Sequence, residues 1–169
     1  VQYEPTLDWK TSRVRVEYLS THNIVKNKKQ SMCKSLVQLL NSLYVYHVDE
    51  DVPITYIAVE RQFRGKMRNV FTAVETWALT HEYKSGVFRF AAYNASDIKR
   101  SFGIRCSGHS SNKRNALLAA RALTVTQTVK NQTHPIEDDH QADALLIALH
   151  HLHKEFQYPL FEMGKVFLA

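Results

Sequence analysis

The chain has 169 residues and a mass of 19.5 kDa, enough for one domain with a substantial hydrophobic core. Its 44% hydrophobic and 22% charged residues argue against disorder, and apolar runs such as ALLIAL are far shorter than the ~20 residues that span a bilayer. The net charge of +6 and the pI near 9.3 favour a polyanionic partner, although basic proteins of many kinds share these values.

The two cysteines, Cys33 and Cys106, are far apart in the sequence and predict neither a disulfide framework nor a zinc site. No signal-peptide pattern is visible. We therefore expect an intracellular protein. The sequence does not distinguish a bacterial or phage cytoplasm from a viral replication site or an organelle matrix.

The first 30 residues have the pattern of a β-hairpin. TLDW and RVRVEYLSTHNIV flank the polar segment KTS, and Val14, Val16 and Tyr18 alternate with charged residues, which is the period of a half-buried strand. From about Lys28 to Tyr46 the period changes to that of an amphipathic helix, with apolar residues three and four apart: Met32, Leu36, Leu39, Leu40 and Leu43.

The rest of the chain alternates strands and helices. ITYIAVE, which follows Pro53, predicts a strand covered on both faces. A helix over 69–83, a strand VFRFAAY and a short helix capped by Asn94 or Ser96 come next. SGHSSNKRNALLAARALTVTQTV predicts a loop entering a longer helix, and a last helix covers about 138–156. Together these elements predict an α/β domain without repeats.

Acidic side chains stand at two places where chemistry is expected. Glu60 is the last residue of the apolar strand ITYIAVE, at the carboxyl edge where ligand and catalytic groups gather in open α/β folds. On the last helix, Asp139 and His140 lie within roughly 40–60° of Asp143, on a face that continues into apolar residues. Carboxylates that meet in a partly dry site repel one another unless cations neutralise them, and oxygen ligands favour Mg²⁺ or Mn²⁺. Such ions assist phosphodiester cleavage.

Structural explanations remain open for the acids and the histidines of the last helix. Asp138 and Asp139 fit an ordinary helix start, where acids cap and complement the helix dipole. His140 taken alone is more often a surface or core residue than a ligand. The three histidines further along the helix do not match a helical zinc motif, and we interpret them as solvated or packing residues: His150, His151 and His153.

Four segments resemble successive blocks of the RuvC-type Holliday junction resolvases and their poxviral and mitochondrial relatives, within the RNase H-like superfamily. They are IAVERQFRGK, VFRFAAYNASDIKRSFGI, SSNKRNALL and DDHQADALLIALHH, in the family's order. The resemblance extends from about Thr6 to His153. It implies a single RNase H-like nuclease domain over 1–169, with a mixed sheet flanked by helices.

The resemblance also implies roles for individual residues. Glu60, His140 and Asp143 would bind metal, Asp139 would be an extra acid found in the viral and mitochondrial branch, and Lys113 would lie near the scissile phosphate. The implied cofactor is Mg²⁺ or Mn²⁺, as two ions. The implied activity is cleavage of four-way junctions in DNA recombination and repair.

One block of the family has no counterpart in this sequence. The family's first central strand ends in Asp-x-Gly, whereas Asp8 in TLDWK lacks both the preceding apolar run and the following glycine. TLDWKTSRVRVEYLS resembles the second and third strands instead. Because ITYIAVE should have a strand on each side, we expect roughly 8–15 further residues before Val1. The alternative is that Asp8 substitutes for the missing ligand.

Basic residues fit a nucleic-acid substrate. Arg61, Arg64, Lys66 and Arg68 follow Glu60, while Lys113 and Arg114 lie near the expected cleft. Phe63 either contacts bases or packs in the core. A four-way junction needs two symmetric nicks, which favours a homodimer. The family resemblance implies that the helix over 69–83 is its interface, and the alternative is that this helix is plain core.

Two functions of different classes remain. The first is a metal-dependent, structure-selective DNA endonuclease that resolves Holliday junctions. The second is a catalytically impaired RNase H-like subunit that binds nucleic acid or serves as a scaffold. An in-frame apolar strand ending in Asp-x-Gly upstream of Val1 would favour the enzyme.

Overall fold

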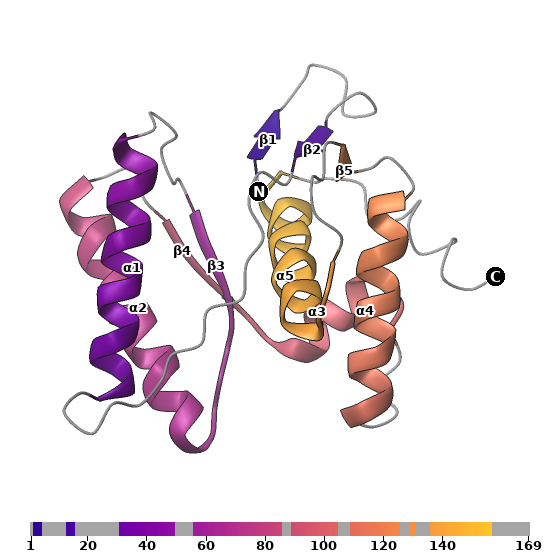
Figure 1. The fold of residues 1–169 in the computed structure, drawn as a ribbon, viewed down its shortest axis with the longest axis horizontal. Helices are drawn as coiled ribbons and strands as arrows, with labels where there is room; N and C mark the ends of the chain where they lie inside the picture. The colour runs from indigo at the N-terminus through magenta and orange to yellow at the C-terminus, as the bar shows by residue number, and fades with distance from the viewer. Residues whose placement is uncertain are drawn as a thin grey trace. The chain divides into compact units, whose positions relative to one another are not determined.

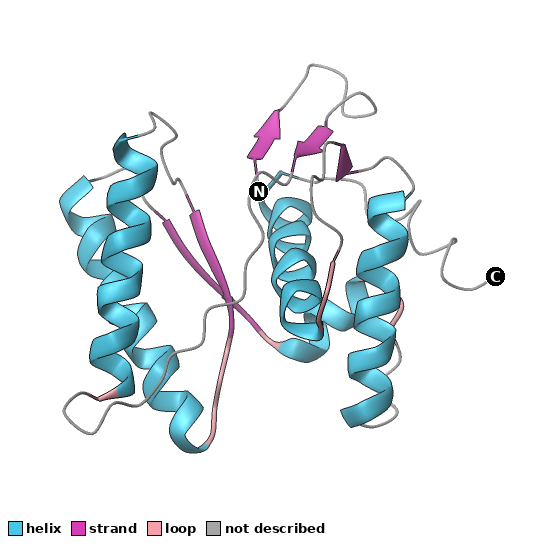
Figure 2. Cartoon of the chain, viewed as in Figure 1, coloured by secondary structure: helices cyan, strands magenta, loops and turns pink. Residues whose placement is uncertain are grey.

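A computed structural model describes the backbone of residues 2–4, 13–15, 31–49, 56–85, 89–104, 109–125, 129–130 and 136–156 (Figure 1). In this part of the chain, helices and strands follow one another as β1 (Gln2–Glu4), β2 (Arg13–Arg15), α1 (Met32–Asp49), β3 (Tyr56–Glu60), α2 (Gly65–Ser85), β4 (Arg89–Tyr93), α3 (Ala95–Ser101), α4 (His109–Val125), β5 (Val129–Lys130) and α5 (Asp139–Phe156) (Figure 2). They form two compact units. Unit 1 comprises Val1–Thr21 with Tyr93–Ala169, and unit 2 comprises His22–Ala92. The α/β class predicted from the sequence is confirmed, whereas the single domain over 1–169 stays a prediction.

Unit 1 contains a small mixed sheet. β1 and β2 pair antiparallel, with Tyr3 opposite Val14, which confirms the hairpin but places its first strand before TLDW. TLDW itself, with Asp8, lies outside the described residues. β5 joins β2 in parallel, with Val14 opposite Val129.

The core of unit 1 lies between its helices. Leu145, Leu146 and Leu149 of α5 are almost fully buried, as the apolar periodicity of the last helix predicts. They form one cluster with further buried residues of α3, α4 and α5 and of the segments beside them: Ile98, Phe102, Ile104, Ala116, Ala119, Ala120, Leu123, Ile136, Ala142 and Leu152. The small side chains on α4 allow it to lie close along α5 (Figure 1).

The end of α3 is fixed by its backbone. The N–H of Ile104 donates to the carbonyl of Lys99, and the N–H of Gly103 donates to that of Arg100. These two bonds are the Schellman arrangement, which needs a left-handed residue after the helix. Gly103 supplies it with a φ of +67°. Asn94 occupies the N-cap position as predicted, but its side chain donates to Asp97 Oδ2 (2.9 Å) instead of capping the backbone.

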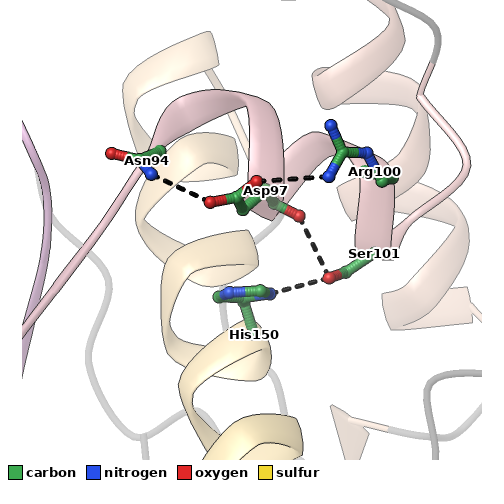
Figure 3. A network of polar contacts seen from close by, with 5 residues as sticks. All are labelled: Asn94, Asp97, Arg100, Ser101 and His150. Atoms are coloured by element: carbon green, nitrogen blue, oxygen red, sulfur yellow. Dashed lines mark hydrogen bonds and ion pairs between the residues drawn. The ribbon is translucent and has the colours of Figure 1, made fainter.

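A partly buried polar network joins α3 to α5 (Figure 3). His150 is 1% exposed, and its Nδ1 lies 2.8 Å from Ser101 Oγ, which donates to the carbonyl of Asp97 (3.1 Å). The His150 ring meets Tyr93 edge-on, with centroids 4.7 Å apart. Tyr93 also bonds to His151 Nδ1 (2.7 Å). His150 and His151 are thus packing residues, one of the two interpretations that the sequence left open.

Unit 2 packs α1 and α2 side by side against β3 and β4 (Figure 1). Trp77 and Ala78 are buried among partly buried residues of α1 and the two strands: Val37, Leu40, Tyr44, Ile57 and Phe90. Trp77 Nε1 donates to Asn41 Oδ1 (2.7 Å), which ties the two helices together. Trp77 and Ala78 therefore belong to the core, and the homodimer interface on this helix stays a prediction.

Two helix starts differ from the sequence prediction. α1 begins at Met32, because Ser31 accepts a bond from the N–H of Lys34 (3.3 Å) and caps the helix there. α2 begins at Gly65, which has a φ of +61°, four residues before the predicted start at Asn69. Lys66 and Arg68 therefore lie on a helix.

β3 is less covered than its sequence predicts. All five of its residues are half-buried, and among the described residues its only strand neighbour is β4. The further strand expected before Val1 stays a prediction. None of the described helices is both long and apolar enough to cross a membrane.

Candidate functional site

The two adjacent acids at the start of α5, Asp138 and Asp139, have different partners. Asp138 is the N-cap residue: its Oδ1 accepts a bond from the N–H of Gln141 (2.8 Å). Gln141 Oε1 in turn accepts from the N–H of Glu137 (2.9 Å), a reciprocal arrangement related to the capping box. The capping explanation is therefore right for Asp138, and the side chain of Asp139 is left for another partner.

That partner is Lys113 of α4. The Lys113 ammonium forms an ion pair with Asp139 Oδ2, at a position where both side chains are partly exposed. The hydrogen bond from Lys113 holds the pKa of Asp139 below its usual range, and the same bond raises the pKa of Lys113. Lys113 lies in the second turn of α4, which already begins at His109.

Asp143 lies one turn further along α5, about 6 Å along the helix axis from Asp139. It is half-buried, and burial raises the pKa of its carboxyl above the ordinary value. The positive charge of Lys99 on α3 opposes this shift, while the negative charge of Asp139 adds to it. Lys99 was not among the residues predicted for the site.

His140 lies between the two acids in sequence but is exposed. Asp139 and Asp143 lie four residues apart on α5 and therefore on one face of the helix. The metal-ligand role of His140 stays a prediction.

The donor set at the start of α5 fits a divalent cation in part. Two carboxylates offer the oxygen ligands that Mg²⁺ prefers, and Mg²⁺ is often held by only one or two carboxylates together with water and substrate phosphates. The described residues contain no group of three or more His, Cys, Asp or Glu side chains placed to hold a metal ion. Glu60 belongs to unit 2, and its role as a third ligand stays a prediction.

Glu60 ends β3, as the sequence predicts. It is half-buried, and its Oε1 accepts a hydrogen bond from Gln62 Nε2 (2.8 Å). This contact orients the carboxylate at the edge of unit 2. The placement of Glu60 at the strand end is confirmed, and its binding of metal stays a prediction.

The segment after Glu60 is basic and exposed. Phe63 is 63% exposed, so the interpretation of this ring as a buried packing residue is wrong. Exposed basic side chains flank it in the sequence, on the β3–α2 connection and the first turn of α2: Arg61, Arg64, Lys66 and Arg68. We call this set, with Phe63, the basic segment. Arg114 of α4 is exposed as well. Such a surface can contact phosphates through its cations and bases through its ring.

Comparison with solved structures identifies the fold. The chain superimposes on the structure of RuvC from Thermus thermophilus with a TM-score of 0.56 and 19% sequence identity, over 93% of this chain and 87% of that one. The chain has the RuvC fold. No family model matches it, and no curated protein does either. The resemblance that the sequence motifs carry is thus supported at the level of the RuvC-like fold, while the poxviral and mitochondrial branch stays a prediction.

Proposed function

We propose that this protein is a metal-dependent, structure-selective DNA endonuclease that resolves Holliday junctions by paired nicks. The observation that carries the proposal is the pair Asp139 and Asp143 at the start of α5. Burial disfavours the charged form of Asp143, and the neighbouring Asp139 disfavours it further. A divalent cation at this place would relieve both effects. The RuvC fold and the basic segment support the same conclusion.

The residues of this chain have distinct tasks in the proposed reaction. Asp139 and Asp143 would hold Mg²⁺ or Mn²⁺, with Glu60 and His140 as the further ligands that the family resemblance implies. Such an ion, when bound, activates water and stabilises the leaving oxygen in phosphodiester cleavage. Lys113 stabilises negative charge at the scissile phosphate. Lys99 reduces the repulsion between the acids.

The basic segment binds the junction in this proposal. Its cations contact backbone phosphates, which supplies affinity and little sequence information. Phe63 stacks on exposed bases. Because a four-way junction has two-fold symmetry, we propose that the protein acts as a homodimer that places one site on each strand to be cut.

The test is cleavage of a synthetic four-way junction by the full-length protein in Mg²⁺, with a linear duplex of the same sequence for comparison. Asp143→Asn and Glu60→Gln should each abolish cleavage and leave junction binding largely intact. Glu155→Gln is the matched control, because it removes one acid from an exposed position on the same helix. It should cleave like the wild type.

Near-normal cleavage by Asp143→Asn or Glu60→Gln would contradict the site. Junction binding without cleavage by the full-length wild type would contradict the enzyme and favour the binding or scaffold subunit.

A further inference from the structure

Lys113 is ion-paired with the Asp139 carboxylate, which the proposed cation needs as a ligand. Its ammonium is paired with Asp139 Oδ2, so a positive charge already stands at one of the two acids. The same pair links α4 to α5 beside the core of unit 1.

Packing fixes the position of this ion pair. Ala116, one turn after Lys113 on α4, is 0% exposed, and so is Ala142, three residues after Asp139 on α5. Both belong to one core cluster. Because small side chains at these positions let the helices approach closely, the pair forms between two helices whose positions are fixed by the core.

We infer that Lys113 and the divalent cation compete for Asp139, so that metal binding releases the Lys113 ammonium and makes it available to a DNA phosphate. The inference rests on the proposed function and deepens it. It assigns Lys113 two successive partners: the Asp139 carboxylate before the metal arrives and the phosphate afterwards. An enzyme built in this way presents its lysine to the substrate only when the site is loaded.

The exposure of the Lys113–Asp139 pair sets how strongly Lys113 should weaken cation binding. The Lys113 and Asp139 side chains are 44% and 26% exposed, so the ion pair is a surface pair of modest strength. Removal of the ammonium should therefore tighten divalent-cation binding about fivefold. By thermodynamic reciprocity, the bound cation weakens the ion pair by the same factor.

The first experiment measures Mn²⁺ binding to the full-length protein without DNA, from the electron paramagnetic resonance signal of free Mn²⁺. Lys113→Met should bind Mn²⁺ about fivefold more tightly than wild type. Lys113→Arg, which keeps a cation that can pair with Asp139, should stay within twofold of wild type. Arg114→Met removes the same charge from the next residue and controls for general electrostatics; it should change the affinity less than twofold. Asp143→Asn should weaken binding.

The second experiment follows the Lys113 amine directly. Limited acetylation of the full-length protein, read by mass spectrometry, should modify Lys113 more rapidly with saturating Mn²⁺ than without it, because an ion-paired amine is protected. Lys34 is exposed on α1 in the other unit and should react at the same rate in both conditions.

Two results would overturn the inference in distinguishable ways. If Mn²⁺ binds in an Asp143-dependent manner but equally well to wild type and Lys113→Met, the metal site stands and the competition does not. If no Asp143-dependent Mn²⁺ binding exists, both the competition and the proposed metal-dependent function are overturned.

Discussion

Acid should destabilise the protein through His150. Burial lowers the pKa of this imidazole from 6.5 to about 4, with smaller contributions from Lys154 and His153. The hydrogen bonds give the local reason. Ser101 donates its one proton to the carbonyl of Asp97, so Nδ1 of His150 donates to Ser101. His150 Nε2 is buried and has no hydrogen-bond partner among the described residues, so protonation there places a charged N–H without an acceptor.

The sign and size of the effect follow from linkage. The folded-state pKa lies below the unfolded value, so His150 contributes stability that is present above pH 6.5 and is lost as the pH falls toward about 4. The loss should be about 1.4 kcal/mol at pH 5.5 and about 3 kcal/mol at pH 4. Burial also lowers the pKa of His151, so this residue should likewise make the protein less stable as the pH falls.

His150→Phe isolates this contribution, because phenylalanine keeps the ring packed against Tyr93 and cannot take up a proton. At neutral pH the variant should be less stable than wild type by about 1 kcal/mol, the worth of the hydrogen bond to Ser101. At pH 4 it should be the more stable protein. Urea unfolding across the pH range should therefore show two stability curves that cross between about pH 5 and pH 6.

Ser101→Ala is the matched control. It removes the same hydrogen bond but keeps the titrating ring, so it should lower stability at neutral pH and still lose stability in acid as the wild type does. A difference between wild type and His150→Phe that stays constant within about 0.5 kcal/mol from neutral pH to pH 4 would refute the reasoning.

Four further predictions concern the fold and the site. Gly103→Ala should cost about 1 kcal/mol in urea unfolding, because its φ of +67° strains any residue with a Cβ although nothing else stands in the way. Asp138→Ala should also cost about 1 kcal/mol through loss of the cap, with α5 fraying visible in hydrogen exchange. Asp143→Asn should raise metal-free stability at neutral pH, a gain that fades as the pH falls through the raised pKa and is gone below the ordinary value of 3.8. In junction binding, Lys66→Ala should flatten the salt dependence by about one unit of slope, whereas Lys113→Ala should lower the cleavage rate far more than the affinity.

Much of the fold could be predicted because apolar residues recur with the helical period on the faces that the helices bury. The apolar residues of α5 repeat at three and four positions, and the structure buries that stripe. The start of α2 could not be predicted in this way. Gly65, Lys66 and Arg68 are all exposed, so no apolar period marks the first turn of that helix.

The acids of the site and Lys113 could be predicted, whereas the pairing of Lys113 with Asp139 and the approach of Lys99 could not. Two adjacent aspartates at a helix start are equivalent in sequence, and only the bond to Gln141 shows that Asp138 is the cap. Lys99 and Lys113 approach the acids because α3 and α4 pack on α5, which no local pattern records. The exposure of Phe63 likewise depends on the path of the chain between β3 and α2.

The network that joins Ser101 to His150 has a consequence for genetics. Lys99 of α3 lies near Asp143 of α5. Two turns further along α5, His150 forms a hydrogen bond with Ser101 of α3. A substitution at Ser101 or Phe102 would let α3 shift and would change the charge that Asp143 experiences, without touching any residue of the site. A screen for loss of the proposed junction cleavage should therefore return two groups of positions: the acids themselves, and a second group where α3 packs on α5.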